Sequence, residues 1–170
     1  MKNWYGLMKI LEFQHLDING DILYEEKNIL NTLHGEGEEF ILSVCFAGLT
    51  VPNNYYFGMD SRFTISSSDV MMDIYNGNYE PTGFGYLRQQ IPSSGSFSIL
   101  LSNGDYKAVS PAVQFTAIGG SWGPVQNIFL TNESNYEGYL IASASLQAPV
   151  TVNAGQSIAM RFAMGLKDGL

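Results

Sequence analysis

The stretch MKILEFQHLDINGDILYEEK at residues 8–27 decides the fold class, because it carries the pattern of a β-hairpin. Two sets of side chains alternate along its first half, and a period of two residues is typical of a strand. The sets are Ile10, Glu12 and Gln14 on one side and Leu11, Phe13 and His15 on the other. Asn19-Gly20 then supplies two residues that readily adopt the positive φ of a tight turn. Ile22 to Lys27 is therefore predicted to return as a second strand.

Further short strands are predicted beyond this hairpin, at 55–59, 84–92, 96–101, 111–117, 124–131, 138–146 and 157–164. The composition agrees, since 18 Gly suit turns while ten Tyr and ten Phe suit half-buried pleated strands. Several short strands at this spacing are typical of a sandwich or a barrel. We therefore predict a mainly β, antiparallel, jelly-roll-like β-sandwich in one domain of 170 residues. Residues 1–27 would form an N-terminal hairpin or arm, and 28–170 the main body.

Residues 31–47 form the one segment with a helical pattern. Asn31 or Thr32 is predicted to cap its start, and Gly48 to end it. The residues predicted to share its apolar face are Leu33, Phe40, Ile41, Val44 and Cys45. The thiol of Cys45 is accordingly expected to be buried and inert. The polar segment 60–80, with its apolar patch at 70–72, is left open as a lid, a partner-binding loop or a short helix.

Charge and cysteine content exclude several kinds of partner and cross-link. The formal net charge of −8 repels nucleic-acid phosphates and anionic lipids, so we expect neither as a direct partner. A single cysteine allows no intrachain disulfide. No apolar run reaches the roughly 18 residues of a membrane helix, and the N-terminus lacks a secretion signal. The protein is expected to be made in a cytoplasm.

Three patterns that resemble chemical sites have simpler interpretations. The sequence GGSWG at 119–123 fits G-x-S-x-G, but a strand is predicted after it and both histidines precede it, so a turn with an anchoring Trp is favoured. The start of a calcium loop at 17–21 lacks the Gly and Glu that an EF-hand needs later. His15, His34 and Cys45 do not have zinc-ligand spacing. We therefore predict no catalytic residue, no metal site and no cofactor, and we interpret the acidic clusters as solvated faces.

Several segments, taken in order, resemble one family. They are 27–31 with the helix 36–46, PNNYYFGM at 52–59, EPTGFGYLR at 80–88, SWGPV within 115–130, GYL at 138–140, Leu146, PVTV at 149–152 and AGQ at 154–156. Together they are similar to small structural proteins of tailed bacteriophages, which include capsid decoration and tail-fibre-like proteins. The segment 80–88 resembles the pattern E-x-x-G-x-G-Y-x-R of that family. Its motif positions here are Glu80, Gly83, Gly85, Tyr86 and Arg88, followed by Trp122 and Gly123.

The physical chemistry of the motif residues suits a structural role. Gly83 and Gly85 permit a bend or bulge, and Tyr86 and Arg88 would then point to one side of a following strand. Arg88 is expected to stack or to pair with an acid. Trp122 is expected in the core, with an interface anchor as the alternative.

The resemblance implies a non-enzymatic virion protein, first of all a decoration or cement protein on the outer shell. Its partners would be the major capsid protein or tail and collar proteins, together with further copies of itself, as a trimer or another cyclic oligomer. The alternative is a tail, collar or fibre component that binds a receptor or a carbohydrate. Tyr55, Tyr56, Tyr75 and Tyr79 are the candidate contacts for that role, because tyrosines in β loops stack on sugars. An enzyme such as a depolymerase would need a pair of carboxylates that nothing in the sequence marks.

Overall fold

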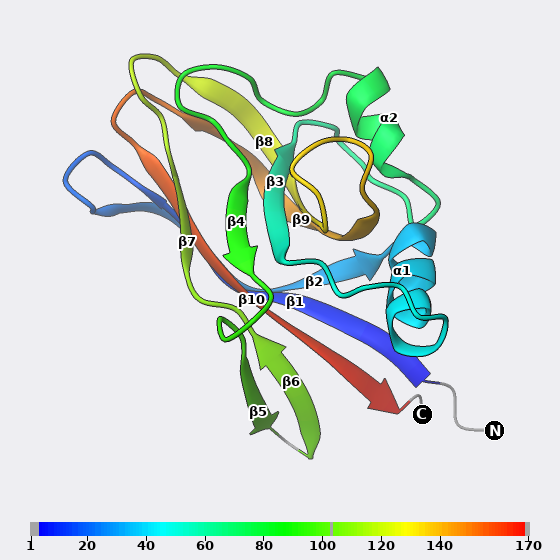
Figure 1. Ribbon diagram of the computed structural model, residues 1–170. Coiled ribbons are helices and arrows are strands. Elements are labelled where there is room, and N and C mark those ends of the chain that lie inside the picture. Colours follow the sequence, from blue (N-terminus) through cyan, green and yellow to red (C-terminus); the bar gives the residue numbers. More distant parts are fainter. Residues whose placement is uncertain (1–3, 103, 169–170) are drawn as a thin grey trace.

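The computed structural model describes residues 4–102 and 104–168 and, within them, ten strands and two helices (Figure 1). The strands are β1 (Trp4–Leu16), β2 (Ile22–Leu33), β3 (Asn54–Asp60), β4 (Gln89–Pro92), β5 (Ser98–Ser102), β6 (Asp105–Val109), β7 (Val113–Thr116), β8 (Trp122–Thr131), β9 (Leu140–Val152) and β10 (Ser157–Asp168). The helices are α1 (Gly35–Phe46) and α2 (Met71–Asn76).

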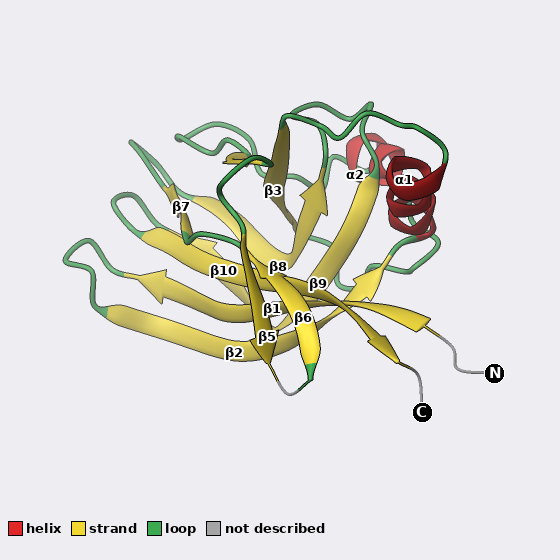
Figure 2. Cartoon of the chain, turned by 60° about the horizontal axis from the view of Figure 1, so that its bottom comes forward, coloured by secondary structure: helices red, strands yellow, loops and turns green. Residues whose placement is uncertain are grey.

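All strands join one antiparallel sheet, in the order β4-β3-β8-β9-β2-β1-β10-β6-β5, with β7 pairing β10 beside this path. The sheet curls into a half-barrel (Figures 1 and 2). The mainly β prediction is confirmed, but the β-sandwich is wrong. A sandwich needs two sheets stacked face to face, whereas here Asn31–Leu33 of β2 pair with Ala142–Ala144 of β9 and connect the two halves edge to edge.

The core lies on the concave side of the half-barrel. Phe57 of β3 and Phe162 of β10 meet there edge to face, with ring centroids 4.8 Å apart. The predicted N-terminal hairpin is confirmed, but its strict alternation is interrupted. The pairing register of β1 with β10 shifts between Ile10 and Glu12. This irregularity lets both Ile10 and Phe13 face the core.

Helix α1 is confirmed but begins later than predicted. Residues 31–33 are drawn into β2 by their pairing with β9, so the helix begins at Gly35 and His34 occupies the N-cap position. Phe40 points into the core, and Gly48 follows the helix with φ +77°. The expected burial of Cys45 is wrong: its thiol is exposed, because it falls at the margin of the buried face near the end of the helix.

Three other segments differ from the sequence prediction. The predicted strand 84–92 is reduced to β4, because positive φ values at Gly83, Phe84 and Gly85 turn the chain before it. β6 was not predicted. The segment 60–80 contains α2, which settles part of that open question in favour of a short helix.

Candidate functional site

The motif at 80–88 forms a buried polar cluster around one carboxylate, which we call the Glu80 cluster (Glu80, Tyr86 and Arg88). Glu80 Oε1 accepts hydrogen bonds from Tyr86 Oη and Arg88 Nε, both at 2.9 Å, and Oε2 accepts one from Arg88 Nη2 at 2.8 Å. The side chains of Arg88 and Glu80 are only 5% and 6% exposed. Tyr86 Oη also accepts the backbone N–H of Met59 at 2.8 Å. The cluster therefore ties the 80–88 segment to strand β3.

Arg88 also reaches across to the loop between β8 and β9. Its Nη1 donates to the carbonyl oxygens of Glu133 and Asn135. Its guanidinium lies over two rings, 5.2 Å from the centroid of Phe129 and 4.6 Å from that of Tyr136. A planar guanidinium can make bidentate and stacking contacts at once, which an ammonium cannot. Arg88 thus cross-links the 80–88 segment to residues 129–136, which are distant in sequence.

The electrostatics of the Glu80 cluster favour a charged guanidinium on Arg88 and protonated phenols on Tyr86 and Tyr136. Burial opposes the charge on Arg88, but hydrogen bonds and the charge of Glu80 outweigh it and raise the pKa of the guanidinium. Burial, reinforced by the negative charge of Glu80, raises the pKa of Tyr86 well above its usual value. The same two causes raise the pKa of Tyr136 to about 12. With three hydrogen bonds already accepted, the Glu80 carboxylate is arranged as a structural anchor.

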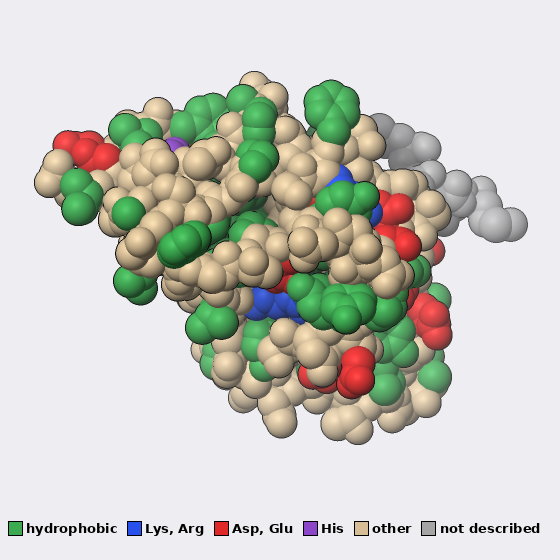
Figure 3. Space-filling model, turned by 90° about the horizontal axis from the view of Figure 1, so that it is seen from above, with side chains coloured by type: hydrophobic (Ala, Val, Ile, Leu, Met, Phe, Trp, Pro, Cys, Tyr) green, Lys and Arg blue, Asp and Glu red, His purple; other side chains and the backbone are tan. Residues whose placement is uncertain are grey.

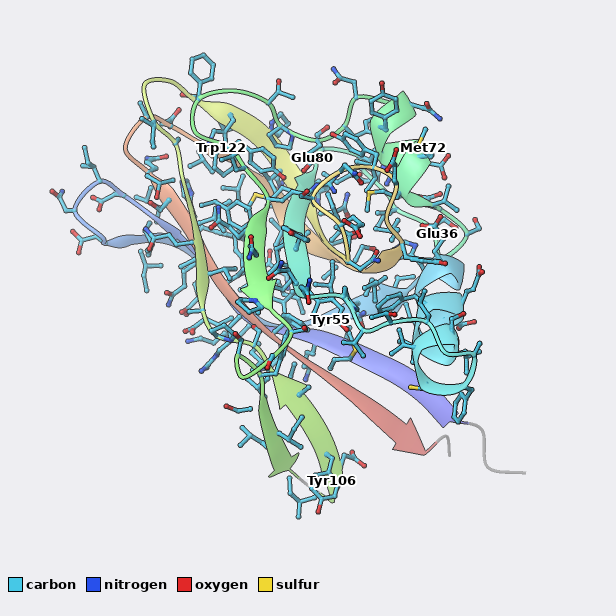
Figure 4. All side chains as sticks on the ribbon, viewed as in Figure 1. Glu36, Tyr55, Met72, Glu80, Tyr106 and Trp122 are labelled. Atoms are coloured by element: carbon cyan, nitrogen blue, oxygen red, sulfur yellow. The ribbon has the colours of Figure 1, made fainter. Side chains whose placement is uncertain are left out.

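Trp122 lies against the Glu80 cluster at the start of β8 (Figure 4). Its ring is 4% exposed and packs edge-on to Tyr86, with centroids 5.5 Å apart. Gly123 has φ +120°, and a Cβ there would lie 2.9 Å from the carbonyl oxygen of Val150. Beside these residues opens a largely polar hollow of about 270 Å³, which Tyr79, Glu80 and Trp122 help to line. The motif residues are therefore gathered in one place, mostly beneath the surface.

A second polar cluster, centred on Arg62, was not predicted. Arg62 Nε donates to Asp60 Oδ2 at 2.8 Å and its Nη1 donates to Asp69 Oδ2 at 2.9 Å. Asp60 is fully buried at the end of β3, and Asn127 Nδ2 donates to it from β8 at 3.3 Å. Figure 3 shows the face of the molecule seen from above Figure 1, where basic groups lie beside acidic ones. The only sequence signal was an Arg two residues after an Asp at the end of a predicted strand.

Glu36 and His34 fasten the start of α1. Glu36 Oε2 accepts the backbone N–H groups of Met71 at 3.0 Å and Leu140 at 2.7 Å, so one carboxylate connects α1, α2 and β9. His34 Nε2 lies 2.8 Å from Ser143 Oγ, and burial lowers the pKa of this histidine. The acidic clusters, to which Glu36 belongs, were interpreted from the sequence as solvated faces, so this connecting role of Glu36 was not predicted.

The four candidate tyrosines do not converge. Tyr75 contacts Tyr136 at a centroid distance of 4.9 Å, and Tyr79 lies under Arg62 at 5.0 Å. Tyr55 and Tyr56 are neighbours on β3, so their side chains leave opposite faces of the sheet. Tyr55 lies at an apolar cavity of about 250 Å³ on the concave side. Tyr56 faces an open hollow of about 400 Å³ that is also lined by Asn53, Asn54, Asn132, Glu133 and Tyr139.

The patterns that resembled chemical sites have structural roles. Ser121 is followed by strand β8 and not by a helix, and its Oγ donates to Asn153 Oδ1 at 3.1 Å. Asp17 Oδ1 accepts the backbone N–H groups of Asn19 and Asp21 in the hairpin turn. Within residues 4–102 and 104–168, no three His, Cys, Asp or Glu side chains gather as metal ligands.

The end of the sheet away from the Glu80 cluster carries an exposed hairpin, β5–β6, which we call the apolar ribbon (Figures 1 and 2). Its large apolar side chains are widely exposed, by 66% at Ile99, 51% at Leu100, 63% at Leu101 and 68% at Tyr106. Figure 4 shows Tyr106 at the tip of this ribbon, far from Glu80 and Trp122. A smaller exposed apolar surface lies on α1, at Leu42 and Phe46. Exposed apolar surface of this kind commonly marks an interaction site.

Comparison with protein-family models and with curated proteins gave no match. In the described part of the chain, neither helix has the length and apolar character needed to cross a membrane.

Proposed function

We propose that this protein is a non-enzymatic structural component of a tailed-phage particle, and that it binds the outer shell as a decoration or cement protein. The observation that carries the proposal is the exposure of large apolar side chains on two elements, the apolar ribbon and helix α1. The resemblance of the 80–88 segment to the motif of tailed-phage structural proteins adds support. Its charged residues form internal cross-links here, which suits a structural role. A tail, collar or fibre position is the alternative within the same proposal.

The composition supports contact with proteins. Only 14% of residues are charged and the net charge is −8, so large apolar contacts are available while phosphate and anionic lipid surfaces are repelled. The proposed partners are the major capsid protein, or a tail or collar protein, and further copies of this chain. Weak contacts suffice in such an assembly, because many copies on one particle add their affinities.

Immuno-electron microscopy of phage particles tests the proposal. An antibody against this protein should label particles at regular positions, and the gene should lie among capsid or tail genes. The double variant L42S/F46S should reduce the copies per particle, because Phe46 is 85% exposed on α1. Ile18→Ser is the matched control, since Ile18 is 74% exposed at the β1–β2 turn, away from α1. Unlabelled particles, with a gene outside any structural cluster, would refute the proposal.

One observation favours a carbohydrate-binding role as a second candidate. The hollow beside Tyr56 combines two tyrosines with Asn132 and Glu133, and sugar sites need both a stacking ring and hydrogen-bonding side chains. A glycan array with the wild type and Tyr56→Ala tests it. Tyr75→Ala is the control, because Tyr75 lies outside this hollow. The candidate requires a glycan signal that the Tyr56 change removes and the Tyr75 change preserves.

A further inference from the structure

The two ends of the strand order, β4 and β5, are protected differently. At one edge, β4 is four residues long and ends in Pro92, which has no N–H to offer. Short strands and prolines are the usual means of preventing edge-to-edge association. At the other edge, β5 reads Ser-Ile-Leu-Leu-Ser with no charge and no proline. Nothing in the described part of the chain pairs with its outer side.

The register of the ribbon shows which backbone groups of β5 face outward. Ser102 and Asp105 are paired directly across the turn, and a pair that closes a two-residue turn exchanges both of its hydrogen bonds. Alternation from this point directs the N–H and C=O of Leu100 toward Lys107 on β6. The same groups of Ile99 and Leu101 therefore point away from the sheet. β5 thus presents two donors and two acceptors at its free edge.

We propose that β5 pairs antiparallel with β5 of a second copy, about a two-fold axis through Leu100. The sequence is nearly palindromic, so this register sets Leu100 opposite Leu100, Ile99 opposite Leu101, and Ser98 opposite Ser102. Each of the two Ile99–Leu101 pairs would exchange two hydrogen bonds. All four outward backbone groups of each copy would then have a partner. Such an interface is isologous, with the same residues on both sides.

Side chains and charge agree with a second copy as the occupant. Leu100 would meet its symmetry mate on one face, and two Ile–Leu pairs would form on the other, so all three exposed side chains gain cross-strand partners. Although the whole chain carries −8, β5 itself brings no like charges together at the axis. The family resemblance implies a trimer or another cyclic oligomer, and a two-fold contact of this kind can link such oligomers to one another.

The size of the contact fits an assembly of many copies. A five-residue strand gives an interface at the small end of specific contacts, so the isolated pair is expected to be weak. Self-association through β5 rests on the proposed particle function for its biological purpose. The two can fail separately, because pairing is measured on the purified chain and the particle function on labelled particles.

Cysteine cross-linking tests both the edge and the register, in a Cys45→Ser background because Cys45 is exposed. Leu100→Cys places two thiols across a non-hydrogen-bonded pair, where Cα atoms lie about 4.5 Å apart, so a disulfide can form. Ile99→Cys is the matched control, since its opposite residue is Leu101 and the two new thiols are offset along the strands. Under mild oxidation, the Leu100→Cys variant should form disulfide dimers and the Ile99→Cys variant far fewer.

Sedimentation measurements provide the second readout. Leu100→Asp brings two like charges together at the axis and should weaken self-association by about tenfold or more, with an unchanged circular dichroism spectrum. Equal cross-linking of the two cysteine variants would refute the register. A chain that stays monomeric at its highest soluble concentration, or that associates as well after Leu100→Asp, would refute the contact. In either case, labelled particles would leave the proposed function standing.

Discussion

The Glu80 cluster and the apolar ribbon lie at opposite ends of one sheet, and their side chains differ in both polarity and burial. In the cluster, charged groups are buried and every oxygen of the carboxylate is paired. In the ribbon, large apolar groups are exposed and a strand edge is unpaired within the described residues. The cluster is complete within one chain, whereas the ribbon leaves a strand edge that the proposed contact with a second copy would complete. The difference teaches that the residues most like a chemical site need not be those that make contacts outside the chain.

Removing Arg88 should have the largest effect on stability. Arg88→Met leaves the carboxylate of Glu80 buried without its cation, and loss of one partner of a buried pair costs about 3–5 kcal/mol. Lys27→Met is the control, because the Lys27–Glu25 pair is exposed and such pairs contribute little to stability. Urea unfolding measures both. The double variant E80Q/R88M should recover part of the loss, and equal behaviour of R88M and K27M would contradict the structural role of the cluster.

Removing the Glu36 carboxylate should have the second-largest effect on stability, because it accepts hydrogen bonds from backbone donors of two elements. Glu36→Ala leaves the N–H groups of Met71 and Leu140 without this acceptor, at an expected cost of about 2–3 kcal/mol. Glu39→Ala is the matched control, since Glu39 is exposed on the same helix. Chemical denaturation gives the energies, and faster proteolysis near α2 should accompany only the first change. If both variants unfold at the same denaturant concentration, the anchoring role of Glu36 is wrong.

Two glycines of α1 that look alike in sequence should respond with opposite signs. A Cβ on Gly37 would lie 2.1 Å from the carbonyl oxygen of Ile141, so Gly37→Ala must push the helix off β9 at a cost of about 1–3 kcal/mol. Gly35 has open space around it, and Gly35→Ala should stabilise the helix by up to about 1 kcal/mol. Thermal unfolding of the two variants compares the signs. Stabilisation by both changes would mean that α1 does not pack closely on β9.

The pH dependence of stability should identify His34. Burial lowers the pKa of His34 below the usual 6.5, against an opposing attraction from Asp69, so the folded state holds the neutral ring. The stability contributed by neutral His34 is complete above about pH 6.5 and falls as the pH drops toward the folded pKa, by at most about 1.4 kcal/mol per pH unit. His34→Gln removes this loss. The gap in unfolding free energy between wild type and variant should therefore narrow from pH 7 to pH 5, and a constant gap would contradict it.

Local patterns predicted most of the elements but not how the sheet closes. The hairpin at 8–27 and helix α1 follow from periodicity and turn chemistry, which act over a few residues. The half-barrel depends on the pairing of residues 31–33 with β9, more than a hundred residues away, and no local signal distinguishes it from a sandwich. The helix start was misplaced for the same reason, because this pairing takes residues 31–33 into a strand.

The candidate sites were predicted to different extents. Glu80 and Arg88 were selected together by their motif, although their mutual contact is a property of the turn at Gly83–Gly85. The Arg62 cluster was missed although Asp60 and Asp69 lie only two and seven residues from Arg62, because no periodic pattern marks how the segment that joins them folds. The ribbon was missed because β6 was not recognised as a strand. Exposure of β5 depends on its place at the end of the sheet order, which the sequence of β5 alone does not contain.

A substitution in the apolar ribbon should have the smallest effect on the free energy of unfolding. This small effect would distinguish the ribbon from the core. Ile99→Thr keeps a β-branched side chain on an exposed strand, so the free energy of unfolding of the dilute monomer should change by about 0.5 kcal/mol or less. Ile128→Thr is the matched control in β8, where the side chain is fully buried and the change should cost about 2 kcal/mol or more. Urea unfolding at low protein concentration compares them. A large loss at Ile99 would mean that this side chain is already packed within one chain, and the ribbon would then resemble the Glu80 cluster in being complete without a partner.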